Sequence, residues 1–147
     1  MSMQRIMLRS KIHHNDSIHE LAVTPDYVFA VGYPDRRFRA FLVECDRGTM
    51  PVERGNLFQT SLKRKILTYT AARHRGEHTR QYGWKAFRVL IITTNAQRFQ
   101  TILATIRRCV PEHERGLFLV ADQSALATTD ILAHAWRDAR GQTHMLI

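Results

Sequence analysis

The sequence predicts an α/β protein whose mixed β-sheet opens with a β-hairpin and is flanked by helices on both faces. Residues 21–46 hold two strand-like runs separated by a turn signal. Residues 53–75 show apolar side chains at helical spacing, and two later apolar runs alternate with a second helical segment. An order of hairpin, helix, strand, helix, strand is typical of helices packed on a mixed sheet.

The hairpin is predicted from residue type and from its turn. Residues 21–33 are rich in β-branched and aromatic residues, which favour a strand, and "RFRAFLVECD" predicts the returning strand. Between them, Pro34 and Asp35 occupy positions that favour a tight turn. If the turn is centred on Asp35, Asp26 faces Glu44 across the hairpin, and a slip of one residue would break this pairing.

A helix is predicted next, over residues 53–75, where apolar side chains recur at helical spacing. Residues 75–83 predict a polar connection to the next strand. Residues 85–95 form the most apolar run, so we expect a central strand there.

The last third of the chain is predicted to alternate in the same way. Asn95 is placed to cap a helix over residues 96–108, which ends before Pro111. Residues 116–122 predict another buried strand and 123–135 a helical or irregular segment. Residues 143–147 predict a final edge strand.

Length and charge restrict the classes of function. The 147 residues suit one domain, 1–147, in which the basic residues 1–16 predict a short helix or a loose arm. Lys and Arg number 22 against 13 Asp and Glu, and a pI near 10.4 indicates a polyanionic partner, most simply DNA. Two cysteines without zinc spacing favour a reducing cytoplasmic location, and no apolar run is long enough to predict a membrane partner.

Three carboxylates are predicted to share one end of the sheet. Asp26 faces Glu44 in the expected register, and Asp46 lies two residues beyond Glu44 on the same face. Such carboxylates repel one another, and a Mg²⁺ or Mn²⁺ ion held by oxygen ligands relieves the repulsion. The alternative is that each acid pairs with a nearby arginine and no metal binds.

The predicted helix supplies two further candidates for catalysis. Lys65 and Tyr69 are one helical turn apart and therefore lie on one face. An ammonium group near the acids could stabilise charge on a scissile phosphate, and Tyr69 could position the nucleic-acid backbone. The alternative is a solvated basic stripe with Tyr69 partly in the core. Phosphate contacts are predicted for Arg36, Arg37, Arg47, Arg54, Lys63 and Arg64.

These motifs resemble the replication-relaxation family of plasmid and mobile-element proteins. The resemblance rests on "TPDYVF", "VECDRGT" and "KRKILTY", covers about residues 20–75, and is weaker through the later strands and "AWRDARGQTHML". It implies a restriction-endonuclease-like, or PD-(D/E)xK, core in which Glu44 matches the Glu of E-x-K. Asp46 stands where those nucleases have the catalytic Lys, and Lys65 where some exonucleases have a Gln before Tyr69.

The resemblance and the acids together predict a Mg²⁺-dependent DNA phosphodiesterase linked to plasmid or mobile-element replication or transfer. Asp26, Glu44 and Asp46 would hold the metal, and Lys65 would supply the ammonium that position 46 lacks. The alternative is a catalytically inactive DNA-binding accessory or regulatory protein on the same scaffold, and a third is a protein-interaction domain. A homodimer and other replication or transfer proteins are the further partners that this function would involve.

Overall fold

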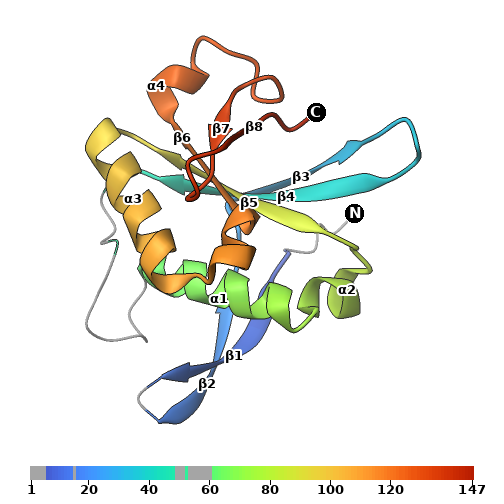
Figure 1. Ribbon diagram of the computed structural model, residues 1–147. Coiled ribbons are helices and arrows are strands. Elements are labelled where there is room, and N and C mark those ends of the chain that lie inside the picture. The colour runs from blue at the N-terminus through green and yellow to red at the C-terminus, as the bar shows by residue number, and fades with distance from the viewer. Residues whose placement is uncertain (1–5, 15, 49–51, 53–60) are drawn as a thin grey trace.

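A computed structural model of the protein describes residues 6–14, 16–48, 52 and 61–147. It is an α/β protein with an N-terminal β-hairpin and a six-stranded mixed sheet with interspersed helices (Figure 1). None of the helices in this described part combines the length and apolar character that a bilayer span requires. The strands are β1 (Leu8–His14), β2 (Ser17–Val23), β3 (Tyr27–Gly32), β4 (Phe38–Asp46), β5 (Phe87–Thr93), β6 (Phe118–Asp122), β7 (Trp136–Arg137) and β8 (Thr143–His144), and the helices are α1 (Leu62–His74), α2 (Glu77–Tyr82), α3 (Ala96–Cys109), α4 (Gln123–Leu126) and the 3₁₀ helix η1 (Glu112–Leu117).

The N-terminal hairpin replaces the helix or arm expected over residues 1–16. Strands β1 and β2 pair antiparallel and form a sheet of their own. Ile12 and Leu21 are buried against Leu67 and Ala71 of α1, on the side of the helix that projects away from the main sheet (Figure 1). Leu8 joins the main core instead. The hairpin is thus held by packing on α1 and on the main core, and its strands do not pair with the six-stranded sheet.

The single strand predicted over residues 21–33 is two strands separated at Pro25. Strand β2 ends at Val23 and β3 begins at Tyr27. Proline has no backbone N–H to donate to a ladder, so the chain changes direction there. The Asp26 N–H then donates to the Val43 carbonyl oxygen at 2.9 Å, which starts the second hairpin.

The β3–β4 hairpin has the predicted register. Tyr27 pairs with Val43 and Phe29 with Phe41, so the next pair in the series is Asp26 with Glu44. At the turn, Arg36 adopts a left-handed φ of 66°. The Asp35 side chain accepts a 3.0 Å bond from the Arg37 N–H and pairs with its guanidinium, so the structural role predicted for Asp35 is confirmed.

The sheet order is β3-β4-β5-β6-β7-β8, with β4, β5 and β6 parallel and the other pairings antiparallel. The run predicted to be central is therefore central, as β5. Its alternate residues enter two cores on opposite faces. One core, which includes Val89 and Ile91, is covered by α1 and α3; the other includes Leu90 and the fully buried Trp136.

The helices confirm some predictions and correct others. Asn95 caps α3, accepting a 2.8 Å bond from the Arg98 N–H, as predicted. Helix α1 begins at Leu62 with Ser61 as its cap, and the part of the predicted helix over 53–60 lies outside the described residues. Residues 75–83, predicted as a polar connection, include the short helix α2. Its Tyr82 hydroxyl donates to the Met7 carbonyl oxygen at 3.0 Å.

Candidate functional site

The candidate site lies at the carboxyl ends of the parallel strands β4 and β5. Glu44 and Asp46 are the last inward-facing residues of β4, and Asp46 pairs in register with Thr93 at the end of β5. The first turns of α1 and α3 reach the same edge, since Lys65 and Arg98 contact these acids. Open α/β sheets usually bind ligands at this edge.

Asp26 is fixed beside Glu44 by the backbone of the neighbouring strand. The Cys45 N–H donates to Asp26 Oδ2 at 2.8 Å, while the Asp26 N–H donates to Val43. Pro25, just before it, is buried, whereas Asp26 is exposed. Its negative charge contributes to raising the pKa of Glu44, so the two carboxylates interact as the register predicts.

Glu44 is a buried carboxylate with two side-chain donors. Its side chain is 3 % exposed. The Tyr69 hydroxyl donates to Oε1 at 2.7 Å and the Lys65 ammonium donates to Oε2 at 2.8 Å. Burial raises the pKa of Glu44, and the bonds from Lys65 and Tyr69 offset only part of this effect. Burial and the nearby Glu44 also raise the pKa of Tyr69, so its hydroxyl remains a donor.

Lys65 and Tyr69 reach one carboxylate because they are one helical turn apart on α1. The face of α1 that carries them is turned toward β4, and Tyr69 is 1 % exposed. Lys65 is 23 % exposed at its side chain, so its ammonium group lies between solvent and the acid. The sequence-based expectation that these two residues lie at the acids is therefore met for Glu44.

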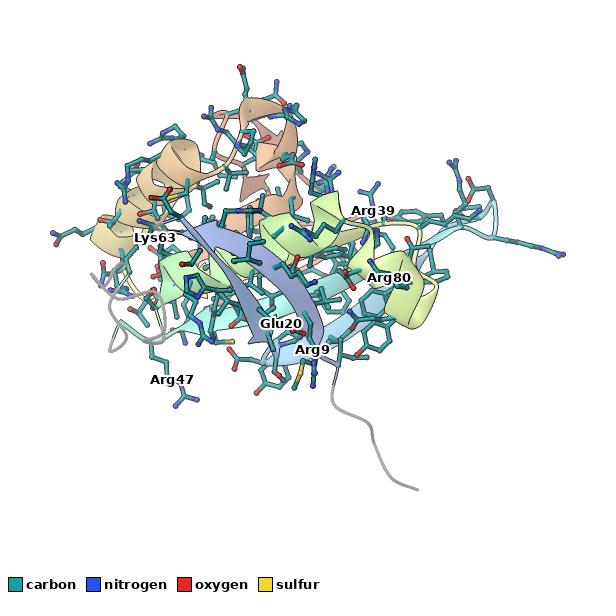
Figure 2. The ribbon with its side chains drawn as sticks, turned by 90° about the horizontal axis from the view of Figure 1, so that it is seen from below. Arg9, Glu20, Arg39, Arg47, Lys63 and Arg80 are labelled. Atoms are coloured by element: carbon teal, nitrogen blue, oxygen red, sulfur yellow. The ribbon has the colours of Figure 1, made fainter. Side chains whose placement is uncertain are left out.

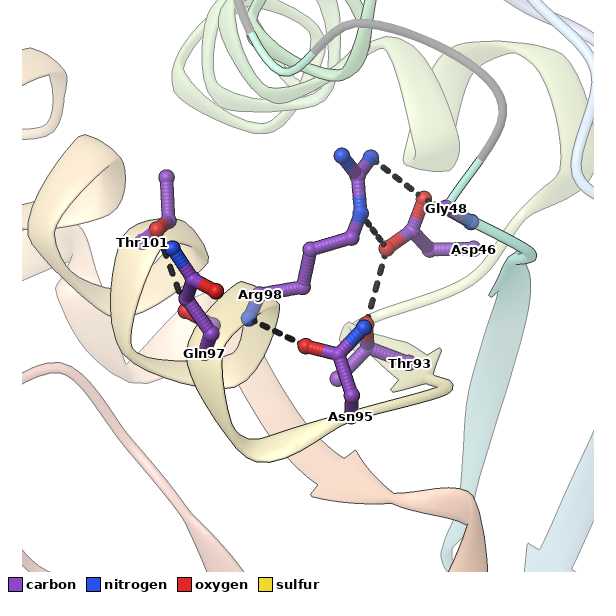
Figure 3. A network of polar contacts seen from close by, with 7 residues as sticks. All are labelled: Asp46, Gly48, Thr93, Asn95, Gln97, Arg98 and Thr101. Atoms are coloured by element: carbon purple, nitrogen blue, oxygen red, sulfur yellow. Dashed lines mark hydrogen bonds and ion pairs between the residues drawn. The ribbon is translucent and has the colours of Figure 1, made fainter.

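Asp46 belongs to a separate network (Figure 3). Arg98 Nε donates to Oδ2 and Arg98 Nη2 to Oδ1, both at 2.6 Å. The Thr93 hydroxyl donates to Oδ2 at 2.8 Å, and the Gly48 N–H to Oδ1 at 3.3 Å. Burial alone would raise the pKa of Asp46, but these bonds outweigh it and lower that pKa. Asp46 is thus paired with an arginine, but the partner is the distant Arg98 and not one of the arginines near it in the sequence.

The donor set leaves two carboxylates for a metal ion. Within the ranges that the structure describes, no three His, Cys, Asp or Glu side chains are grouped so that they could hold a metal ion. Asp46 accepts four hydrogen bonds, whereas Glu44 accepts one at each oxygen, so a metal ion would use the remaining acceptor sites of Glu44 together with Asp26. Mg²⁺ often binds to one or two carboxylates and completes its shell with water and phosphate. A metal at Asp26 and Glu44 fits these residues and stays a prediction.

The predicted phosphate contacts divide between the two ends of the molecule. Arg47 follows β4, and Lys63 lies in the first turn of α1, both at the end with the acids (Figure 2). Arg64 is partly buried, and its Nε atom has no hydrogen-bond partner. Arg36 and Arg37 lie in the turn at the far end of the β3–β4 hairpin. Arg54 lies outside the described residues.

Arg98 and Thr93 are the site residues that the sequence did not single out. Arg98 lies 52 residues from Asp46 along the chain. A signal was present nonetheless. Arg98 is three residues after the predicted cap Asn95, in the first turn of a helix that follows a central strand, and that turn adjoins the end of the next parallel strand.

Comparison with known proteins finds no relative of this chain. The chain matches no protein-family model, no curated protein and no solved structure. The resemblance drawn from the sequence motifs therefore stays a prediction, and the proposal that follows depends on the geometry of the site.

Proposed function

We propose that this chain is a DNA-directed, Mg²⁺- or Mn²⁺-dependent phosphodiesterase on a restriction-endonuclease-like scaffold, acting in plasmid or mobile-element replication or transfer. The observation that supports it most is the 2.8 Å bond from Lys65 Nζ to Glu44 Oε2, formed beside Asp26. Two adjacent carboxylates can hold a metal ion that activates water, and an ammonium group can stabilise charge on a phosphodiester. They come from three separate elements, so the fold and not local sequence places them together.

Asp26 and Glu44 would hold the metal ion. When bound, such an ion polarises a phosphoryl oxygen and lowers the pKa of a water molecule. The raised pKa of Glu44 means that a proton competes for the same oxygens. Metal affinity should therefore increase as the pH rises through the pKa of Glu44.

Lys65 would act on the phosphate. Its ammonium group is partly exposed and lies at the edge of the acid pair, where it can stabilise negative charge that develops on the phosphate oxygens. Tyr69 would orient Glu44, because its hydroxyl holds the other carboxylate oxygen at 2.7 Å. The +9 net charge and the nearby Arg47 and Lys63 would attract the DNA backbone.

One observation favours the inactive DNA-binding alternative. Asp46 occupies the position where the E-x-K pattern has its lysine, and Arg98 holds it in two short bonds. A scaffold that had lost catalysis could keep such a link for stability alone. In that case Lys65 would be a structural partner of Glu44, and the protein would bind DNA without cutting it.

Metal binding is tested first, with thermal denaturation in Mg²⁺ and in Mn²⁺. Wild type should gain melting temperature with either ion, and Asp26→Asn and Glu44→Gln should gain much less. Asp35→Asn is a matched control, because it removes the carboxylate of the second Pro-Asp pair at the far end of the hairpin. Equal gains in all four proteins would overturn the metal site.

Catalysis is tested on single-stranded, double-stranded and branched DNA with Mn²⁺. Lys65→Ala should lower the rate by roughly 10²- to 10³-fold, the usual effect of removing one charge-stabilising donor. A cleavage rate that is unchanged in Lys65→Ala would contradict the role proposed for Lys65. Metal-dependent stabilisation with salt-dependent DNA binding but no cleavage would select the inactive alternative.

A further inference from the structure

A cationic cleft lies at the opposite edge of the sheet from the acids. Its volume is about 220 Å³, and its walls come from the amino ends of β5 and β6 and from the elements beside them. Four arginines line this cleft, together with His113 of η1. They are Arg39 of β4, Arg88 of β5, Arg73 in the last turn of α1 and Arg140 from the loop between β7 and β8. Four arginines from four parts of the chain therefore line one small space.

These arginines have few partners of their own. The side chains of Arg39, Arg73 and Arg88 make no hydrogen bond or ion pair with any residue in the described part of the chain. Arg140 reaches Asp138 only at 3.5 Å. Cationic side chains brought together without acids are usually balanced by a bound anion.

The nearest acids are already engaged and do not line the cleft. Asp138 is fully buried and accepts a 2.7 Å bond from His144 Nε2 as well as bonds from the backbone. Glu114 accepts from His74 Nδ1 at 3.1 Å. Neither carboxylate is among the lining residues.

The surroundings of Arg88 disfavour its positive charge. Burial lowers the pKa of Arg88, and the neighbouring charge of Arg39 lowers it further. Tyr33 and Asp138 act in the opposite direction but do not cancel these effects, and an anion in the cleft would offset them further. Gly116 leaves room for the arginine opposite, because a Cβ atom there would lie 3.2 Å from Arg140 Nη2.

We infer that this four-arginine cleft is a binding site for a phosphate monoester. The planar guanidinium fork matches phosphate oxygens in pairs, and a dianion balances clustered positive charge better than a single charge does. The site goes beyond the proposed hydrolysis, because it uses none of the residues at the acid end. Its existence does not depend on metal binding or cleavage.

A wider cleft of about 850 Å³ adjoins the first, and Arg39 and Ala86 line both. Phe38 lies in its wall and is 51 % exposed, as a base-stacking side chain must be. Arg36 and Arg37, predicted as phosphate contacts, line it too. The phosphate monoester can therefore belong to the end of a DNA strand or to a free nucleotide.

The experiment uses the full chain and three probes: inorganic phosphate, a nucleoside 5′-monophosphate, and a short oligothymidylate with or without a 5′-phosphate. Calorimetry at constant ionic strength should show saturable phosphate binding. Arg39→Gln with Arg73→Gln should weaken it by about tenfold or more, since each change removes charge-assisted hydrogen bonds. Arg9→Gln is the matched control, an exposed arginine on β1 that lies away from Arg39 (Figure 2).

The outcomes distinguish a phosphate at a DNA end from a free nucleotide, and they test whether the binding site exists. A stronger affinity for the 5′-phosphorylated than for the 5′-hydroxyl oligonucleotide, lost in the double variant, identifies a DNA end. Tighter binding of the mononucleotide identifies a free nucleotide. Binding that Arg9→Gln weakens as much as the double variant does, or no saturable binding of any probe, would overturn the site. Arg39 is partly exposed and Arg73 is exposed, so replacing them leaves the buried core unchanged.

Discussion

Glu44 and Asp46 show how the number of donors decides the state of a buried carboxylate. They lie two residues apart on one strand, face the same side and are 2 % and 4 % exposed. Glu44 receives one ammonium and one hydroxyl donor, and burial still raises its pKa. Asp46 receives two guanidinium bonds, a hydroxyl and an N–H, which together lower its pKa. The first is suited to exchange protons or ligands, and the second to hold two elements together.

These opposite shifts predict opposite effects of pH on stability. The stabilising contribution of Glu44 is fully present below its usual pKa of 4.5 and is lost as the pH rises through its higher folded pKa. The contribution of Asp46 is present above its usual pKa of 3.8 and is lost as the pH falls through its lower folded pKa. Urea denaturation from acid to neutral pH measures both.

As the pH rises, the free energy of unfolding of wild type should fall relative to that of Glu44→Gln. Over the acid range, the same rise in pH should increase it relative to that of Asp46→Asn. Each variant serves as the control for the other, because both replace a buried carboxylate on the same strand by an amide. Parallel pH profiles for the two differences would contradict the assignment.

At the scale of single elements, α3 begins at a side-chain cap that also fixes the Asp46 network. Asn95 accepts from the Arg98 N–H, and the Arg98 guanidinium binds Asp46 (Figure 3). Asn95→Ala should destabilise the protein by about 0.5–2 kcal/mol, and Asn95→Ser should restore most of the loss. Gln97→Ala, a change at an exposed position in the same turn, should have little effect in chemical denaturation.

The β1–β2 hairpin offers a second test at this scale. Leu21 is 3 % exposed and packs with Ile12 on α1, whereas Ile18 is 61 % exposed. Leu21→Ala should cost about 2–5 kcal/mol of unfolding free energy, because it leaves a cavity under the hairpin. Ile18→Ala should be nearly neutral. A small loss at Leu21 would indicate that the hairpin opens without unfolding the main core, and hydrogen exchange in β1 would detect this.

Local signals explain which elements the sequence predicts. The β3–β4 register, the central position of β5 and the Asn95 cap follow from turn residues, apolar runs and a capping residue. Strand β1 was missed although its buried residues alternate, because Ser10 is one of them and basic residues fill the outward positions. Helix α2 buries only His78 and is held by tertiary contacts, which no local pattern reveals.

The parts of the candidate site that depend on local patterns could also be predicted from the sequence. Helical periodicity places Lys65 and Tyr69 on one face, and the hairpin register places Asp26 beside Glu44. The pairing of Asp46 with Arg98 needs the parallel alignment of two strands joined by a long connection. That alignment is a property of the whole sheet.

For the whole molecule, the net charge of +9 predicts DNA binding that weakens with salt. The logarithm of affinity should fall linearly with the logarithm of salt concentration. Arg47→Gln and Lys63→Gln should each reduce that slope by about one, uniformly across DNA sequences. Fluorescence anisotropy over a salt series measures the slope. A slope unchanged in both variants would move the DNA interface to another surface.

The acids and the arginine cleft lie at opposite ends of β4, and this separation limits how one nucleic acid could reach both. Arg39 and Glu44 are five residues apart, about 17 Å along a strand at roughly 3.3 Å per residue. Residues an odd number of positions apart on a strand point to opposite faces of the sheet, so a DNA strand held at Arg39 could not run straight along β4 to Glu44, and no fixed fragment length is expected. Fragments of one narrow size, about five nucleotides, would contradict this and would show that the two ends act on one strand.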